Sequence, residues 1–164
     1  MVAVQAVALG ADGWRRWRAL RLTALADAPE AFGSTLAQWS GAGDTEERWR
    51  ARWVGVPDNL VLVQDGRDVG MVSLAAPTGD EPPELISMWV APEARRTGAA
   101  DAAVAAVLAL ARTRYPGQPV VLSVYAANAV ARRLYARHGF VDAGVSPDDE
   151  DERRMVHRGP PPPG

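Results

Sequence analysis

Residues 90–100 constrain the fold of this chain most, because an apolar strand passes there through a short turn into a long alanine-rich helix. The N–H groups in the first turn of a helix have no partners inside the helix, and the helix dipole adds about half a positive charge there. Gly98 lets the main chain approach a ligand closely, and Arg95 adds a fixed cation with several donors. The junction therefore predicts a binding site for a phosphate or pyrophosphate group.

A second block follows at residues 128–140 and reads N-x-x-A-x-x-L-Y-x-x-x-G-F. Asn128 is a good N-cap residue, and Gly139 stands where a helix needs a left-handed residue after its C-terminus. Together with V-x-P-x-x-R-x-x-G-x-A at residues 90–100, this block resembles the two signature motifs of the GNAT superfamily of N-acyltransferases. The two motifs stand in the order and spacing of that family.

The order of the expected elements indicates a mixed α/β sheet. Apolar, β-branched runs predict strands at residues 2–9, 60–64, 69–75, 84–91, 120–124, 140–144 and 153–158. Helices are expected at residues 14–26, 98–113 and 128–138, and residues 31–43 read as a loop or a short helix. A further helix should begin at Asp44, with Glu47 as its capping-box partner.

The resemblance implies a central mixed sheet that splays open between its fourth and fifth strands, with helices on both faces. Acetyl-CoA inserts at the splay as acyl-donor cosubstrate, and no metal is expected. The residues implied in binding it are Met88, Val90, Arg95, Arg96, Thr97, Gly98, Ala99, Ala100, Asn128 and Tyr135. The turn has fewer glycines than the family pattern, but N–H donors do not depend on side chains, and Thr97 can add a hydroxyl donor. Asn128 can cap its helix, hydrogen-bond the pantetheine arm, or do both.

The implied reaction is transfer of an acetyl group to a primary amine by direct attack in a ternary complex. A lysine-like amine has a pKa of about 10.4, so a proton acceptor helps at neutral pH. The resemblance implies Glu84 as this base, with Asp80 or Glu81 as substitutes, and Tyr135 as the acid that assists the leaving thiolate. Glu84 can equally be an exposed strand-end carboxylate, and Tyr135 a tyrosine that only packs. A main-chain N–H of the fourth strand is expected to bind the oxyanion.

Composition excludes several classes of site. With 164 residues the chain fits one domain, expected over 1–158, followed by a disordered proline-rich tail at 159–164. The absence of cysteine excludes disulfides and a cysteine nucleophile, and the two histidines lack the spacing of a zinc site. No apolar run is long enough for a bilayer and no signal peptide is recognisable, so a cytoplasmic location is expected. All 18 basic residues are arginine, which indicates GC-rich codons and a bacterial genome.

Two alternatives to the enzyme stay open. The first is a catalytically silent acyl-CoA sensor on the same fold. The second is a nucleic-acid or acidic-partner module that uses Arg15, Arg16, Arg18 and Arg21, although a net charge of −2 does not favour it. These arginines are more readily a solvated helix face than contacts to the substrate or to CoA phosphate groups. Trp49 and Trp53 are more readily core residues than residues of an acceptor pocket. The acceptor is a small-molecule amine or a protein amino group, with no membrane partner, and the sequence leaves homodimerisation open.

Overall fold

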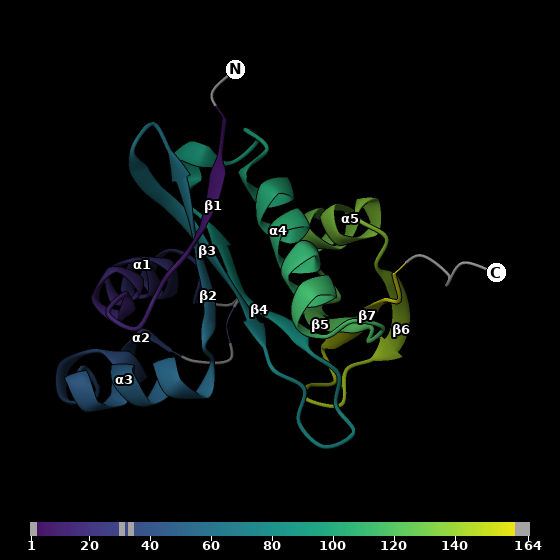
Figure 1. Cartoon of the computed structure of the whole chain (residues 1–164), viewed down its shortest axis with the longest axis horizontal. Helices are drawn as coiled ribbons and strands as arrows, with labels where there is room; N and C mark the ends of the chain where they lie inside the picture. The colour runs from purple at the N-terminus through teal and green to yellow at the C-terminus, as the bar shows by residue number, and fades with distance from the viewer. Residues whose placement is uncertain (1–2, 30–31, 33–34, 160–164) are drawn as a thin grey trace.

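The computed structural model describes residues 3–29, 32 and 35–159 and shows one sheet with helices on both faces (Figure 1). The strands are β1 (Gln5–Ala8), β2 (Asp58–Gln64), β3 (Arg67–Ala75), β4 (Glu84–Val90), β5 (Val120–Tyr125), β6 (Val141–Val145) and β7 (Glu152–His157). The helices are α1 (Trp14–Asp27), α2 (Leu36–Trp39), α3 (Glu46–Gly55), α4 (Ala99–Arg114) and α5 (Ala129–Arg137), with 3₁₀ turns η2 (Gly41–Gly43) and η3 (Pro92–Ala94). The predicted α/β class is confirmed.

The sheet has the strand order β1-β2-β3-β4-β5-β7-β6. Strands β1 to β4 form an antiparallel run, and its β2–β3 hairpin turns through Asp65 and Gly66. Both turn residues have positive φ, 52° and 74°, the conformation that fits a tight turn to the twist of a hairpin. The antiparallel set β5, β7 and β6 forms the other part of the sheet.

The two parts meet at β4 and β5, which run parallel but pair only where Glu84 lies opposite Val121. Beyond that pair the strands diverge, and their facing main-chain groups are not joined in a ladder. This divergence confirms the predicted splay between the fourth and fifth strands.

Each face of the sheet has its own core. On one face, helix α4 packs against aliphatic residues such as Leu62, Val72 and Leu122. On the other, α1 and α3 enclose a core rich in tryptophan, formed by Trp14, Trp17, Trp49, Trp53 and Trp89. Trp49 and Trp53 are therefore core residues, as the sequence predicted. Figure 1 shows the two sets of helices on opposite sides of the strands.

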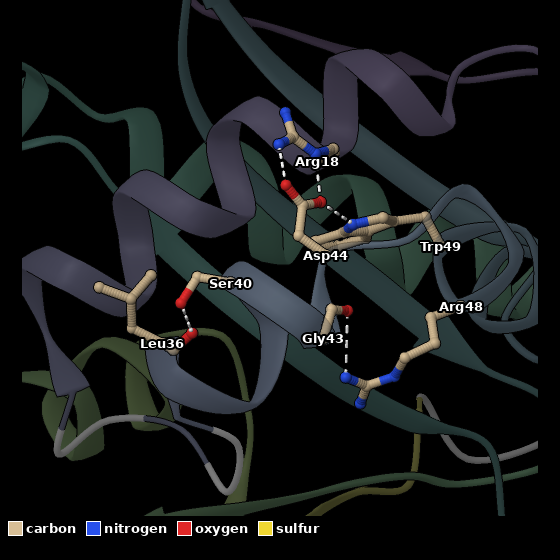
Figure 2. A network of polar contacts seen from close by, with 7 residues as sticks. All are labelled: Arg18, Leu36, Ser40, Gly43, Asp44, Arg48 and Trp49. Atoms are coloured by element: carbon tan, nitrogen blue, oxygen red, sulfur yellow. Dashed lines mark hydrogen bonds and ion pairs between the residues drawn. The ribbon is translucent and has the colours of Figure 1, made fainter.

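The start of α3 differs from the sequence prediction. Thr45, not Asp44, is the N-cap, and its hydroxyl accepts a hydrogen bond from Arg48 N at 3.2 Å. Figure 2 shows why Asp44 is unavailable: its carboxylate is held by both guanidinium donors of Arg18 and by Trp49 Nε1 at 2.8 Å. These hydrogen bonds lower the pKa of Asp44 to about 2. Asp44 therefore fixes the loop before α3 against α1.

Two other expectations need correction. The sequence of helix α4 is apolar around nearly all its circumference, which predicts burial on all sides, but the helix buries one stripe that includes Val104, Val107 and Ala111 and exposes small residues opposite. Arg21, expected on a solvated face, is only 8% exposed. Its position between Leu20 and Ala24 on α1 turns it toward α3. Residues 1–2, 30–31, 33–34 and 160–164, with parts of the expected first strand, loop and tail, lie outside the described residues.

Candidate functional site

A cavity of about 500 Å³ opens where β4 and β5 diverge. Its wall includes six residues that the resemblance implied: Met88, Val90, Arg95, Ala100, Asn128 and Tyr135. Four others, Arg96, Thr97, Gly98 and Ala99, lie in the adjoining turn and helix start rather than in the wall. The structure thus brings the predicted binding residues to one cavity and its border.

The turn before α4 presents a row of N–H groups. Arg96 and Gly98 have positive φ, 64° and 89°, and the first helical hydrogen bond runs from Ala102 N to Gly98 O. Within the described part of the chain, no main-chain or side-chain acceptor is found for the N–H groups of residues 96–101. Residues 95–98 are exposed, so an anion can reach these donors. A Cβ at Gly98 would meet no atom within 4 Å, so open space lies beside the turn.

Arg95 is held in a fixed position by two other segments. Its Nε donates to Val90 O at 3.0 Å, and its Nη2 pairs with Asp27 Oδ2 at 2.6 Å. Trp89 Nε1 donates to the same oxygen at 3.0 Å, and with Arg95 it lowers the pKa of Asp27. Arg95 therefore joins β4, the turn and the end of α1, and Asp27 partly compensates its charge.

The Thr97 hydroxyl is already committed as a donor. Its Oγ1 donates to Ala94 O at 2.5 Å within the turn. The hydroxyl hydrogen is therefore not directed at a phosphate, and the donors of this turn are its main-chain N–H groups.

A bulge in β4 turns main-chain groups toward the cavity. Ser87 has a φ of 57°, and the β3–β4 register shifts opposite it, between Met71 and Ser73. Beyond the bulge, Ala91 N donates to Val69 O at 2.7 Å. Because alternate residues of a strand address opposite neighbours, the N–H of Val90 points toward β5, where the ladder has ended. The predicted oxyanion donor thus has a suitable direction.

Tyr135 lies in the cavity wall and is only 6% exposed. Its ring meets Phe140 edge-on at 5.8 Å between centroids. Burial raises the pKa of Tyr135 to about 12, so the hydroxyl stays protonated at neutral pH. Among the residues that the structure describes, none forms a hydrogen bond with this hydroxyl. The hydroxyl is therefore available to a ligand.

Asn128 has the capping role that the sequence predicted. Its Oδ1 accepts a hydrogen bond from Ala131 N at 3.1 Å at the start of α5. The residue also lines the cavity, so its amide nitrogen can still contact a ligand.

Glu84 lies at the closed end of the splay, opposite Val121, and is not part of the cavity wall. Its side chain is 28% exposed, and Oε1 is 3.6 Å from Arg154 Nη2. Burial raises the pKa of Glu84, although the Arg154 charge acts in the opposite direction. Of its two predicted substitutes, Glu81 pairs with Arg154 at 3.0 Å, and Asp80 is exposed.

Glu152 is a carboxylate that the sequence analysis did not single out. It lines the cavity, and burial raises its pKa above the ordinary value. Val121 and Tyr125 of β5 lie on one face of the sheet, and their cross-strand neighbours Glu84 and Glu152 share it. This face is opposite α4, because Leu122 and its alternate neighbours pack in the α4 core. All residues of the run 148–152 are acidic, so the sequence alone did not distinguish Glu152 from its neighbours.

Two arginines lie on the α1 and α3 face of the sheet; the sequence named Arg21 only as a less favoured substrate contact, and it did not single out Arg52. Arg21 is buried, and Arg52 donates to Ser87 Oγ at 3.3 Å, at the bulge itself. Burial lowers the pKa of each to about 10. The apolar spacing of Trp17, Leu20 and Ala24 was a signal that could have placed Arg21 on the inner face of α1.

The described residues include neither a metal-binding cluster nor a membrane-spanning helix. No group of three or more histidine, aspartate or glutamate side chains there is arranged to hold a metal ion. None of the helices there is both long and apolar enough to cross a membrane.

Comparisons with known proteins agree with this geometry. A family model described as Acetyltransferase (GNAT) family matches residues 20–140. A search of curated protein sequences gives no significant match. One similar solved structure is PaiA N-acetyltransferase from Thermoplasma acidophilum with coenzyme A, at 13% identity and a TM-score of 0.72, covering 95% of this chain and 99% of that one. Another is spermidine N-acetyltransferase from Vibrio cholerae with CoA and spermine, at 19% identity and a TM-score of 0.73, covering 93% of this chain and 94% of that one. A third is Ard1 from Thermoplasma volcanium, at 19% identity and a TM-score of 0.68, covering 95% of this chain and 97% of that one. At these identities the likeness concerns the fold.

Proposed function

This chain belongs to the acetyltransferase (GNAT) family, and from that premise we propose that it transfers the acetyl group of acetyl-CoA to a primary amine. The amine is that of a small molecule or a protein, and it attacks directly in a ternary complex. Solved neighbours in complex with CoA, one of them also with spermine, support the cosubstrate and the amine class. The alternative is a catalytically silent acyl-CoA sensor on the same fold.

The observation that carries the proposal is the continuity between the turn and the cavity. The N–H groups of residues 96–101, which have no acceptor among the described residues, border the cavity that contains Val90 and Tyr135. The turn fits a diphosphate, and the gap between β4 and β5 fits an extended pantetheine arm. In this arrangement the protein supplies hydrogen-bond donors at both ends of the bound acetyl-CoA. The N–H groups of the turn face its diphosphate, and Val90 and Tyr135 face its thioester.

The N–H of Val90 stabilises the oxyanion that forms when the amine adds to the thioester carbonyl. This N–H belongs to a strand fixed by β3 on its other edge, so it is held in place before the reaction. Removal of one such preorganised donor typically costs about 3–4 kcal/mol of transition-state stabilisation.

Glu84 accepts the proton of the amine through water, because it lies beyond the cavity wall. Its raised pKa makes it a better base than an ordinary carboxylate. Glu152 lies on the same face of the sheet and lines the cavity, so it is the alternative candidate for this base.

Tyr135 assists the departure of the thiolate. With a pKa of about 12, the hydroxyl holds its proton more firmly than a thiol, whose pKa is about 8.5. The hydroxyl therefore stabilises the leaving thiolate sulfur by a hydrogen bond. A proton transferred from Tyr135 to the sulfur would return to the tyrosine, because the thiol is the stronger acid.

The test pairs calorimetry with a thiol-release assay. The full-length chain should bind CoA and release thiol from acetyl-CoA in the presence of a suitable amine. CoA binding without product across a broad amine panel would favour the sensor. Failure to bind CoA at all would refute both proposals.

A further inference from the structure

Beside the site, α1 and α3 carry two cationic side chains, Arg21 and Arg52, that have no acidic partner among the described residues. Arg21 and Arg52 are close enough for the charge of Arg21 to lower the pKa of Arg52. In the described ranges, 3–29, 32 and 35–159, no carboxylate forms an ion pair with either of them. A buried charge normally has such a partner, because desolvation is otherwise costly.

The arginines between α1 and α3 show the contrast directly. Arg18, on the same helix as Arg21, has the carboxylate of Asp44 against its guanidinium group (Figure 2). Arg50, on the same helix as Arg52, pairs with Glu46 at 2.8 Å. The two arginines that face inward lack a carboxylate, whereas these two outer arginines have one.

The donors of this cluster exceed its acceptors. Arg21 Nη1 and Trp17 Nε1 are buried, and neither has a hydrogen-bond partner in the part of the chain that the structure describes. They lie one helical turn apart on α1, on the face that meets α3. Arg52 donates only to neutral oxygens, from Nη1 to Asn59 Oδ1 and from Nη2 to Ser73 Oγ and Ser87 Oγ. A negatively charged group would accept hydrogen bonds from the donors that remain unpaired, Arg21 Nη1 and Trp17 Nε1.

The cluster adjoins the cavity at two points. Arg52 Nη2 reaches Ser87, the bulge residue, which lines the cavity. Arg21 lies over the ring of Phe32 at 4.5 Å, and Phe32 also lines it. Both contacts lie on the side of the sheet that faces α1, the side that carries Glu84 and Glu152.

We infer that Arg21 and Arg52, with Trp17 Nε1, bind a carboxylate of the acceptor, so that the substrate is a primary amine that also carries a carboxylate. The inference rests on the proposed acetyl transfer and names its substrate class. Glu84 and Glu152 face the amino end, and the arginines face the acidic end. Polyamines, which have no anionic group, fit this arrangement poorly.

The experiment compares amino acids with the corresponding amino acid amides. The two series differ in the carboxylate, but also in the pKa of the amine, so kcat/KM is expressed as the ratio of wild type to variant on each substrate. Arg21→Met and Arg52→Met should raise KM for the acids about 10- to 100-fold, because hydrogen bonds to a charged group contribute about 1.5–3 kcal/mol. The ratio for the amides should stay near one.

Matched controls come from exposed arginines of the same helices, Arg15→Met on α1 and Arg50→Met on α3, which should leave both ratios near one. The two test variants should melt at or above the temperature of wild type, since they remove a poorly compensated buried charge. A further variant, Glu30→Gln, tests whether the carboxylate of Glu30, which lies outside the described residues, is a counter-ion of these arginines. Tighter binding of the acids by Glu30→Gln would identify an internal counter-ion and overturn the inference.

A binding measurement separates this inference from the proposed function. Calorimetry with an N-acetyl amino acid, in the presence of CoA, should show binding that Arg21→Met weakens at least tenfold. Equal ratios for acids and amides, with efficient acetylation of neutral amines, would overturn the carboxylate site and leave the acetyltransferase intact. Binding of the N-acetyl amino acid without turnover of any amine would support the carboxylate site and refute the acetyltransferase.

Discussion

The two sides of the cavity offer different kinds of hydrogen-bond donor. At the start of α4 the donors are main-chain N–H groups, presented by a helix terminus and by residues of positive φ. Beside α1 and α3 they are side-chain donors of Trp17, Arg21 and Arg52. Main-chain donors survive most substitutions, whereas side-chain donors are lost with a single one. The comparison teaches that cosubstrate binding is a property of the fold, while acceptor choice depends on a few residues.

The largest expected effect is on kcat, the rate of the chemical step that takes place between the two sides of the cavity. Tyr135→Phe removes a hydroxyl in the cavity wall that no described residue hydrogen-bonds, and it should lower kcat about 100-fold, within the range for a positioned acid. The dissociation constant of CoA should change little. Tyr125→Phe is the matched control, because Tyr125 also lines the cavity but lies on β5. Steady-state kinetics and calorimetry measure the two quantities, and equal kcat in both variants would remove Tyr135 from the mechanism.

The next prediction concerns the main-chain side. Gly98→Ala places a Cβ at a φ of 89°, which should distort the turn and raise KM for acetyl-CoA about tenfold, corresponding to about 1.4 kcal/mol. Gly117→Ala, at the other end of α4 with a φ of 80°, imposes a similar strain away from the turn. Both variants should melt at lower temperature, but only Gly98→Ala should affect KM. An unchanged KM would mean that the turn does not contact the cosubstrate.

A smaller, pH-dependent effect distinguishes the two carboxylates of the acceptor face. Glu84→Gln should lower activity several-fold at neutral pH, since water can still take the proton. The ratio of wild-type to variant activity should approach one as the pH falls through the pKa of Glu84, which burial places above its ordinary 4.5. Ionisation of the amine cancels in this ratio. If Glu152→Gln shows this dependence and Glu84→Gln does not, the base is Glu152.

The smallest effect is on stability and concerns the paired arginine. Asp44→Asn should lower Tm at neutral pH, because Asp44 binds Arg18 and Trp49. The folded-state pKa of about 2 lies below the ordinary 3.8, so the stabilisation is complete above about pH 4 and is lost as the pH falls toward 2. Thermal denaturation of both proteins across this range should show their Tm values converging. A difference that persists at pH 2 would assign the effect to packing.

The sequence predicted features that depend on neighbouring residues better than features that depend on distant ones. Asn128 caps α5 as expected, because its partner Ala131 is three residues away. Asp44 does not cap α3, because Arg18, from another helix, binds its carboxylate. The burial of Arg21 depends on the packing of α1 against α3, although helical spacing pointed to it. The bulge at Ser87 depends on the register with β3, which the strand's own sequence does not encode.

Asp27 is where the two sides of the cavity are joined, since Trp89 and Arg95 both donate to its Oδ2 from β4 and from the turn. An anion that draws Arg95 away leaves this oxygen with one donor and loosens the end of α1. Thermodynamic linkage makes such an influence mutual: whatever repositions the end of α1 must alter affinity at the turn by the same factor. If acetyl-CoA and the acceptor bind on these two sides, the affinity for each therefore depends on the presence of the other.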